Sequence, residues 1–169
     1  MSAETVWSGR YIEAVKDGRW EYVRRKGEIE AAVILAIDEE DHVVLVEQYR
    51  VPVGARCLEL PAGLVGDEED GETVETAAIR ELEEETGYRA ERVERLGRFH
   101  ASPGMTSEAF WLVRATGLTR AGDGGGAGDE DIAVHLVPRA EVAAFVAAKR
   151  AEGVAMDVKM LVLLADGWV

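Results

Sequence analysis

Residues 66–88, which read GDEEDGETVETAAIRELEEETGY, constrain this chain more than any other segment. Glu81, Glu84 and Glu85 lie at helical spacing within it, because a helix turns about 100° per residue and brings positions three and four apart onto one side. Like charges at this spacing destabilise an isolated helix by about 0.2–0.5 kcal/mol per pair. The segment therefore predicts a short helix with an acidic face that needs a counter-charge.

Arg80, four residues before Glu84, is one candidate for that counter-charge. Mg²⁺ or Mn²⁺ is a better one, since these hard cations take oxygen ligands. Glu72 lies near the expected helix start, where an acid suits the helix dipole, and Gly87 suits the left-handed position that ends a helix. Glu83 points to the opposite side, toward solvent. The alternative interpretation is a solvated acidic helix, which a Glu-rich chain forms easily.

The composition bounds the class of protein. A chain of 169 residues fits one domain, 1–169, with a proper core. Its net charge of −14 would repel DNA, so we expect no nucleic-acid partner. Cys57 is the only cysteine, no apolar run is long enough to span a membrane, and the N-terminus has no secretory signal pattern. We therefore expect a cytoplasmic protein with no disulfide and no membrane partner.

Hydrophobic patterning predicts mixed strands and helices. A hairpin is expected over 11–15 and 19–24, and residues 121–128 read as a glycine-rich loop with almost no capacity to pack. The remaining predictions are strands over 31–37, 43–49, 57–60, 93–99, 109–115 and 132–137, and helices over 141–151 and 157–166. The expected class is α/β (α+β), an α/β/α sandwich with a mixed sheet, preceded by an N-terminal antiparallel extension over 1–27.

The acidic segment resembles a known family motif. Seven fixed positions and two apolar ones match the pattern of the Nudix hydrolases: Gly66, Glu72, Arg80, Glu81, Glu84, Glu85 and Gly87, with Leu82 and Tyr88. The likeness extends to RWEYVRR at 19–25, VEQYR at 46–50, ELPAG at 59–63 and SPG at 102–104. These segments resemble the ADP-ribose pyrophosphatase (ADP-sugar diphosphatase) branch. Pro103 lies 16 residues after Gly87, where a proline marks ADP-sugar substrates in this family. Alternatively, Pro103 and Gly104 simply form a turn.

The resemblance implies roles for the acidic face. Glu81 and Glu85 would be the main metal ligands, with Glu84 close by and the Ala62 carbonyl completing the shell of the first ion. Arg80 would hold the glutamates in place. The implied cofactor is Mg²⁺, with Mn²⁺ as an alternative.

The resemblance also implies a substrate-binding set. Glu59 would touch metal-bound water or substrate, Arg50 would face the diphosphate or the base, and Arg25 would contact the nucleoside. Trp20, and less closely Trp7, match aromatic residues that clamp the adenine, partly across a dimer interface. The alternative is that both tryptophans are core or dimer-interface residues.

The catalytic base is implied to lie on the loop over residues 122–131. In this branch a glutamate on a mobile loop after the proline orients the attacking water. Glu130 is our choice, with Asp131 and Asp129 as rivals. Glycine-rich composition fits a loop that closes on substrate, although a disordered loop would look the same. Glu108 is another acid that could face the cleft.

The resulting expectation is a homodimeric, metal-dependent hydrolase of a small nucleoside diphosphate sugar. It would cleave ADP-ribose, or a related ADP-sugar, to AMP and ribose 5-phosphate. One alternative is a Nudix hydrolase acting on another nucleoside diphosphate derivative, such as a GDP-sugar, NADH or an oxidised nucleotide. A second is a non-catalytic nucleotide sensor.

Overall fold

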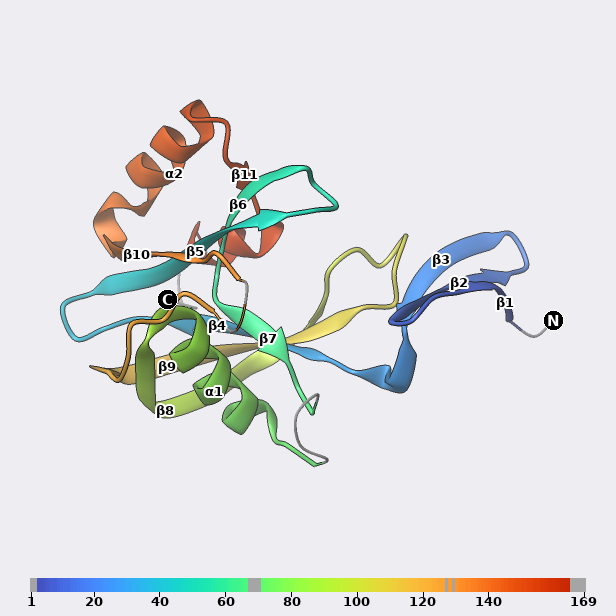
Figure 1. Ribbon diagram of the computed structural model, residues 1–169, viewed down its shortest axis with the longest axis horizontal. Coiled ribbons are helices and arrows are strands. Elements are labelled where there is room, and N and C mark those ends of the chain that lie inside the picture. The colour runs from blue at the N-terminus through green and yellow to red at the C-terminus, as the bar shows by residue number, and fades with distance from the viewer. Residues whose placement is uncertain (1–2, 67–70, 127, 129, 165–169) are drawn as a thin grey trace.

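The strands form three sheets in the computed structural model, which describes residues 3–66, 71–126, 128 and 130–164 (Figure 1). An N-terminal antiparallel sheet has the order β1-β2-β3, and two mixed sheets of the body have the orders β10-β5-β6-β11 and β7-β4-β9-β8. The strands are β1 (Glu4–Ser8), β2 (Ile12–Asp17), β3 (Trp20–Arg25), β4 (Ala31–Ala36), β5 (His42–Arg50), β6 (Ala55–Glu59), β7 (Ala62–Leu64), β8 (Tyr88–His100), β9 (Ala109–Arg120), β10 (Ala133–Pro138) and β11 (Ala155–Met156). The helices are η1 (Lys26–Glu28), α1 (Val74–Thr86), η2 (Arg139–Glu141), α2 (Val142–Ala151) and η3 (Val158–Leu164).

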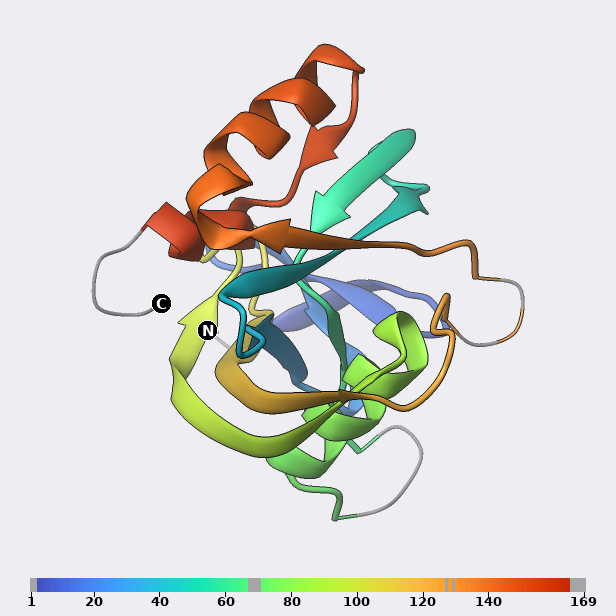
Figure 2. The same cartoon turned by 90° about the vertical axis from the view of Figure 1, so that its left-hand side faces the viewer.

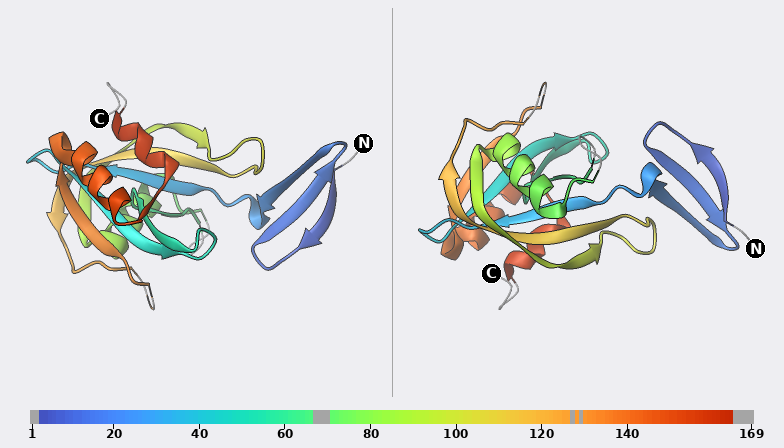
Figure 3. Two further views of the ribbon diagram at one scale, coloured as in Figure 1. Left: turned by 90° about the horizontal axis from the view of Figure 1, so that it is seen from above. Right: turned by 90° about the horizontal axis from the view of Figure 1, so that it is seen from below.

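The N-terminal sheet projects away from the rest of the molecule, as both views in Figure 3 show. The predicted hairpin is present as β2 and β3, which pair from Asp17↔Trp20 onward. Strand β1 was not predicted, because every residue in it is exposed and the segment has no alternation of burial. The amide of Val23 donates to the Met105 carbonyl at 2.9 Å. This bond ties the projecting sheet to the loop between β8 and β9.

The core lies on both faces of strand β4. Ile34 packs in one cluster with Leu82 of α1. Leu35 faces the opposite way and packs in a second cluster with Leu45 of β5, in the β10-β5-β6-β11 sheet. This period of two is that of a strand buried on both sides. Helix α1 covers the outer face of the β7-β4-β9-β8 sheet, and α2 lies at the far side of the molecule beyond β5 (Figures 1 and 2). The predicted mixed α+β class with helices on both sides is confirmed.

Some element boundaries differ from the predictions. Strands β8 and β9 are longer than expected. The added part of β8 is rich in Arg and Glu and that of β9 contains Gly117, so both read as loop, although their backbones pair from Tyr88↔Arg120 onward. The C-terminal segment forms the 3₁₀ helix η3 instead of an α-helix. Its first bond runs from the Met160 amide to the Asp157 carbonyl at 3.1 Å, an i to i+3 spacing. The last two residues of that predicted helix lie outside the described residues.

Candidate active site

Helix α1 is capped at both ends, and this fixes the register of its glutamates. The side chain of Thr73 accepts a hydrogen bond from the Thr76 amide at the N-terminus. Gly87 takes the left-handed conformation at the C-terminus, with φ 73°, and its amide donates to the Glu83 carbonyl. Glu81 and Glu85 are therefore directed toward the body, as their spacing predicts.

Arg80 joins the acidic side chains around the helix. Its Nε donates to Glu72 at 3.1 Å and its Nη1 donates to Glu81 at 2.8 Å. The Nη1 also lies 3.5 Å from a carboxylate oxygen of Glu84. The hydrogen bond to Glu72 is the largest of the effects that raise the pKa of Arg80 and lower the pKa of Glu72. This guanidinium therefore supplies part of the counter-charge that the acidic face requires.

Glu85 is the most deeply placed acid of this face, with only 7% of its surface exposed. Its Oε2 accepts a hydrogen bond from the Ala62 amide at 3.0 Å. Burial raises the pKa of Glu85 to about 8, and the nearby negative charge of Glu81 adds to the increase. The Ala62 hydrogen bond and Arg50 oppose that increase without cancelling it. The site thus holds a carboxylate whose charge the surrounding protein does not fully compensate.

Gly63 lies directly against Glu81, and sequence reasoning gave it no role. A Cβ atom at this position would sit 1.8 Å from Cδ of Glu81. Its φ is not in the left-handed region, so a side chain here would be opposed only by the Glu81 side chain, which it would displace. The absence of a side chain at Gly63 sets where the Glu81 carboxylate lies.

A cavity of about 840 Å³ gathers most of the predicted site residues. Its lining comes from strands β3 to β7, β9 and β11, helix α1, the loop before β10 and the start of η3. Its charged lining comprises six acids, Glu59, Glu81, Glu85, Glu108, Glu130 and Asp157, and three cations, Arg25, Arg50 and Lys159. The excess of carboxylates would repel a diphosphate unless other cations accompany it.

Each cation of this cavity is already bound to an acid. Arg50 makes a two-point contact with Glu59, at 2.6 and 2.9 Å, and this contact raises the pKa of Arg50. Arg25 donates to Glu108 at 2.8 Å. Lys159 pairs with Asp157 at the start of η3. The pairing fixes the direction of each positive side chain. Lys159 lines the cavity but was not among the predicted site residues.

Three predicted substrate residues lie together but outside this cavity. Trp20, Pro103 and Gly104 line a shallower groove of about 390 Å³ beside Tyr22. The groove and the cavity share strand β3, which contributes Trp20 to the first and Arg25 to the second. Trp7 lies on β1 and lines neither.

The glycine-rich loop packs closely, contrary to the prediction. Amides of Gly125 and Gly126 donate to the carbonyls of Glu85 and Glu84, at 2.9 and 3.0 Å. A Cβ at Gly124 would lie 2.4 Å from the backbone of Thr86. The glycines in this part of the loop therefore permit close approach to the end of α1. The prediction for Asp129 falls outside the described residues.

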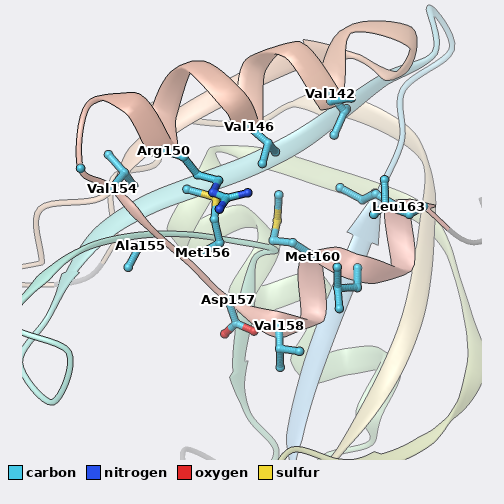
Figure 4. Close-up of a pocket in the computed structure, with 14 residues that line it drawn as sticks. Val142, Val146, Arg150, Val154, Ala155, Met156, Asp157, Val158, Met160 and Leu163 are labelled. Atoms are coloured by element: carbon cyan, nitrogen blue, oxygen red, sulfur yellow. The ribbon is translucent and has the colours of Figure 1, made fainter.

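A second cavity, of about 760 Å³, adjoins the first along β11 and η3 (Figure 4). Figure 4 shows its wall formed by apolar side chains of α2 and η3, including Val146 and Leu163. Arg150 and Asp157 are its only ionisable lining residues in the described part of the chain. This cavity has no pair of acids and is not the candidate site.

Two negative findings concern the described residues alone. Within ranges 3–66, 71–126, 128 and 130–164, no group of three or more His, Cys, Asp or Glu side chains stands in an arrangement ready to hold a metal ion. Glu81 is instead turned to Arg80, and Glu85 to the Ala62 amide. Among the same residues, no helix is both long and apolar enough to cross a membrane.

Comparison with known proteins assigns the family. The model of the NUDIX domain matches residues 28–157, beginning just after β3. The methanol dehydrogenase activator of Bacillus methanolicus is 38% identical over 81% of this chain and 75% of its own length. The ADP-ribose pyrophosphatase of Bacillus subtilis is 36% identical over 70% of this chain and 66% of its own length. The GDP-mannose pyrophosphatase of Cronobacter sakazakii is 36% identical over 88% of this chain and 80% of its own length.

A solved structure supports the fold. It is described as an ADP compounds hydrolase and superposes with a TM-score of 0.67 at 24% identity, covering 90% of this chain and 93% of its own. Members of the matched family generally use divalent metals. The complete set of fixed motif positions, the fold and these relatives together establish that the chain belongs to the Nudix hydrolase family.

Proposed function

We propose that this protein hydrolyses the diphosphate of ADP-ribose, or of a related ADP-sugar, to AMP and a sugar phosphate. The observation that carries the proposal is the cavity in which Glu81, Glu85 and Glu130 face Arg25 and Arg50. Acids for metal binding and proton transfer thus share one space with guanidinium groups suited to phosphate or base. The similarity to an ADP-ribose pyrophosphatase supports the choice of substrate.

The donor set fits a divalent cation, which we propose to be Mg²⁺ or alternatively Mn²⁺. Glu81, Glu85 and Glu84, together with the carbonyl of Ala62, whose amide donates to Glu85, are oxygen donors of the kind these ions prefer. The incomplete charge compensation of Glu85 also favours a cation there. The ion, when bound, would neutralise charge on the diphosphate and acidify the attacking water.

Residues of the chain would then position the substrate and deprotonate the attacking water. Arg50, held by Glu59, would orient the diphosphate, and Arg25, held by Glu108, would contact the nucleoside. The Glu130 carboxylate would accept the proton of the attacking water. We prefer Glu130 to Asp131, since Glu130 lines the cavity whereas the side chain of Asp131 pairs with Arg56. Arg80 would keep the glutamates in place.

The groove formed by Trp20, Pro103 and Gly104 would take the adenine. An indole offers a flat, rigid face on which a base can stack. Exposed apolar residues on the N-terminal sheet, including Val6 and Trp7, support the further proposal that this sheet forms a homodimer interface. In that case Trp7 would approach substrate only across the dimer.

The test is a product assay by chromatography with Mg²⁺ and a panel of ADP-ribose, ADP-glucose, GDP-mannose, NADH and 8-oxo-dGTP. The highest kcat/KM on ADP-ribose, with AMP and ribose 5-phosphate as products, is the expected result. A clear preference for GDP-mannose would favour the alternative that the Cronobacter sakazakii relative supports. Binding of nucleotide without any turnover would indicate a sensor instead.

A further inference from the structure

The loop between β9 and β10 forms the C-terminal cap of the acidic helix. The last four carbonyls of a helix have no partner within it. In α1 the carbonyl of Glu83 accepts from Gly87, and the carbonyls of Glu84 and Glu85 accept from the amides of Gly126 and Gly125. The fourth, that of Thr86, accepts a weaker bond from Arg120 at 3.4 Å. Three of the four partners therefore come from the segment 120–126.

Close backbone contact at glycines makes this arrangement possible. A Cβ at Gly87 would lie 2.3 Å from the Gly122 carbonyl oxygen, and a Cβ at Gly124 would lie 2.6 Å from the Gly87 nitrogen. Real Cβ atoms do not approach backbone so closely, and both residues also have positive φ. We call this contact of Gly87, Gly122 and Gly124 the glycine seam.

The same loop carries Glu130 into the cavity. Gly126, whose amide caps Glu84, lies against the Glu130 side chain, since a Cβ there would be 2.5 Å from Oε2 of Glu130. Further along, the Asp131 carboxylate is held at 3.0 Å by Nη1 of Arg56. Arg56 is itself fixed by the buried carboxylate of Glu47, at 2.8 Å.

We propose that the glycine seam and the Arg56–Asp131 contact are positioning devices that set Glu130 relative to Glu81 and Glu85. The glutamates and Glu130 would then move as one unit, because the loop is bonded to the carbonyls of Glu84 and Glu85, on the same helix as Glu81. This inference rests on the proposed function, in which Glu130 accepts the proton of the attacking water. Gly124, Arg56 and Asp131 are positioning residues and do not touch substrate.

The first test compares Gly124→Ala with Gly128→Ala. Both glycines have positive φ, at 69° and 65°, but a Cβ at Gly128 meets nothing within 4 Å. We expect Gly124→Ala to lower kcat by about 10–100-fold with KM within about threefold, since small misplacement of a catalytic group has effects of this size. Gly128→Ala should keep the wild-type kcat and KM. Equal losses in the two variants would overturn the role of the seam.

Amide hydrogen exchange in the metal-free protein gives a readout that does not depend on turnover. Exchange at Gly125 and Gly126 should accelerate in Gly124→Ala and stay unchanged in Gly128→Ala. If these amides exchange at the wild-type rate in Gly124→Ala, the seam does not hold the loop, and the proposal is wrong.

A surface variant covers the case in which Gly124→Ala does not fold. Asp131→Asn removes a carboxylate that is 90% exposed, so the fold should be unaffected. We expect kcat to fall about threefold at unchanged KM and melting temperature, a small effect because exposed ion pairs are weak.

Glu130→Gln separates the hypothesis that Glu130 is the base from the hypothesis that the loop positions it. Full activity in that variant contradicts the proposed base, whereas an inactive Glu130→Gln beside a fully active Asp131→Asn and Gly124→Ala contradicts only the positioning.

Discussion

The acidic helix and the N-terminal sheet hold their functional candidates in opposite ways. Each charged side chain of α1 itself, within the described residues, is fixed by a partner in the chain, as Arg80 holds Glu72 and Glu81. On the N-terminal sheet Trp7 and Trp20 are each 56% exposed, without burial to fix them. The first region is organised before any ligand arrives. The second has apolar surface that only a ligand or another chain would cover. Changes near α1 should therefore alter catalysis, and changes in the sheet should alter binding.

Glu85→Gln should have the largest effect. Losing a carboxylate that we assign to metal binding should lower kcat/KM for ADP-ribose by about 1,000-fold, or about 4 kcal/mol. Stability should not fall, because the amide oxygen of Gln can still accept from Ala62, and Gln avoids the cost of ionising a buried carboxyl that the raised pKa of Glu85 reflects. Steady-state kinetics and thermal melting check both statements. Near-normal activity would show that α1 is only a solvated acidic helix.

Glu47→Gln should have the next largest effect, on stability. Burial raises the pKa of Glu47, but hydrogen bonds from Lys149, Arg56 and His135 outweigh it and lower that pKa to about 2. Against an ordinary value of 4.5, this difference amounts to about 3 kcal/mol of folding free energy at neutral pH. Because the folded pKa is the lower one, this contribution is complete above about pH 5 and is lost as pH falls toward 2.

Urea unfolding of wild type and Glu47→Gln at pH 7, 5, 4 and 3 measures that contribution. The difference in unfolding free energy should be constant between pH 7 and 5 and should shrink at pH 4 and 3. A difference that does not change with pH would show that packing, not ionisation, accounts for the role of Glu47. In that case paired charges would not be what orders the side chains of the body. The contrast with the N-terminal sheet would then no longer hold.

Gly63→Ala tests whether the space beside Glu81 matters. The new Cβ would overlap the Glu81 side chain, whose flexible end can move away at little cost to stability. We expect kcat/KM to fall about 30-fold, or about 2 kcal/mol, with a melting temperature near that of wild type. Gly97→Ala is the control, because its φ is also outside the left-handed region and its Cβ would meet only the Phe99 ring, at 3.1 Å, away from Glu81. Retained activity in Gly63→Ala would mean that the position of Glu81 is not critical.

Local features of the site could be predicted from the sequence, whereas contacts between distant segments could not. The register of Glu81, Glu84 and Glu85 could be predicted because it is local, set by helical period and by the glycine at position 87. The contact of Gly63 with Glu81 could not, since it joins segments 18 residues apart across a strand and a loop. Sequence shows that a residue is glycine but does not show which atoms of the folded chain approach it.

The glycine loop was misjudged for the same reason. A run of glycines reads as flexible, because glycine has the largest backbone freedom in the unfolded chain. Here Gly124 to Gly126 pack against the end of α1, a contact that depends on the tertiary arrangement. The change of helix type in η3 is also a tertiary effect. Asp157 accepts the amide of Lys159 and shapes a turn that hydrophobic period alone does not predict.

Trp20→Ala should have the smallest effect and should appear in binding alone. If the indole stacks on adenine, KM for ADP-ribose should rise about fivefold, or about 1 kcal/mol, while kcat stays within about twofold. Its high exposure implies an unchanged melting temperature. Trp7→Ala, on the strand outside the groove, is the comparison variant, and light scattering would reveal whether either change dissociates a dimer. A loss of kcat in Trp20→Ala at constant KM would contradict the division of roles, because the projecting sheet would then take part in the chemical step.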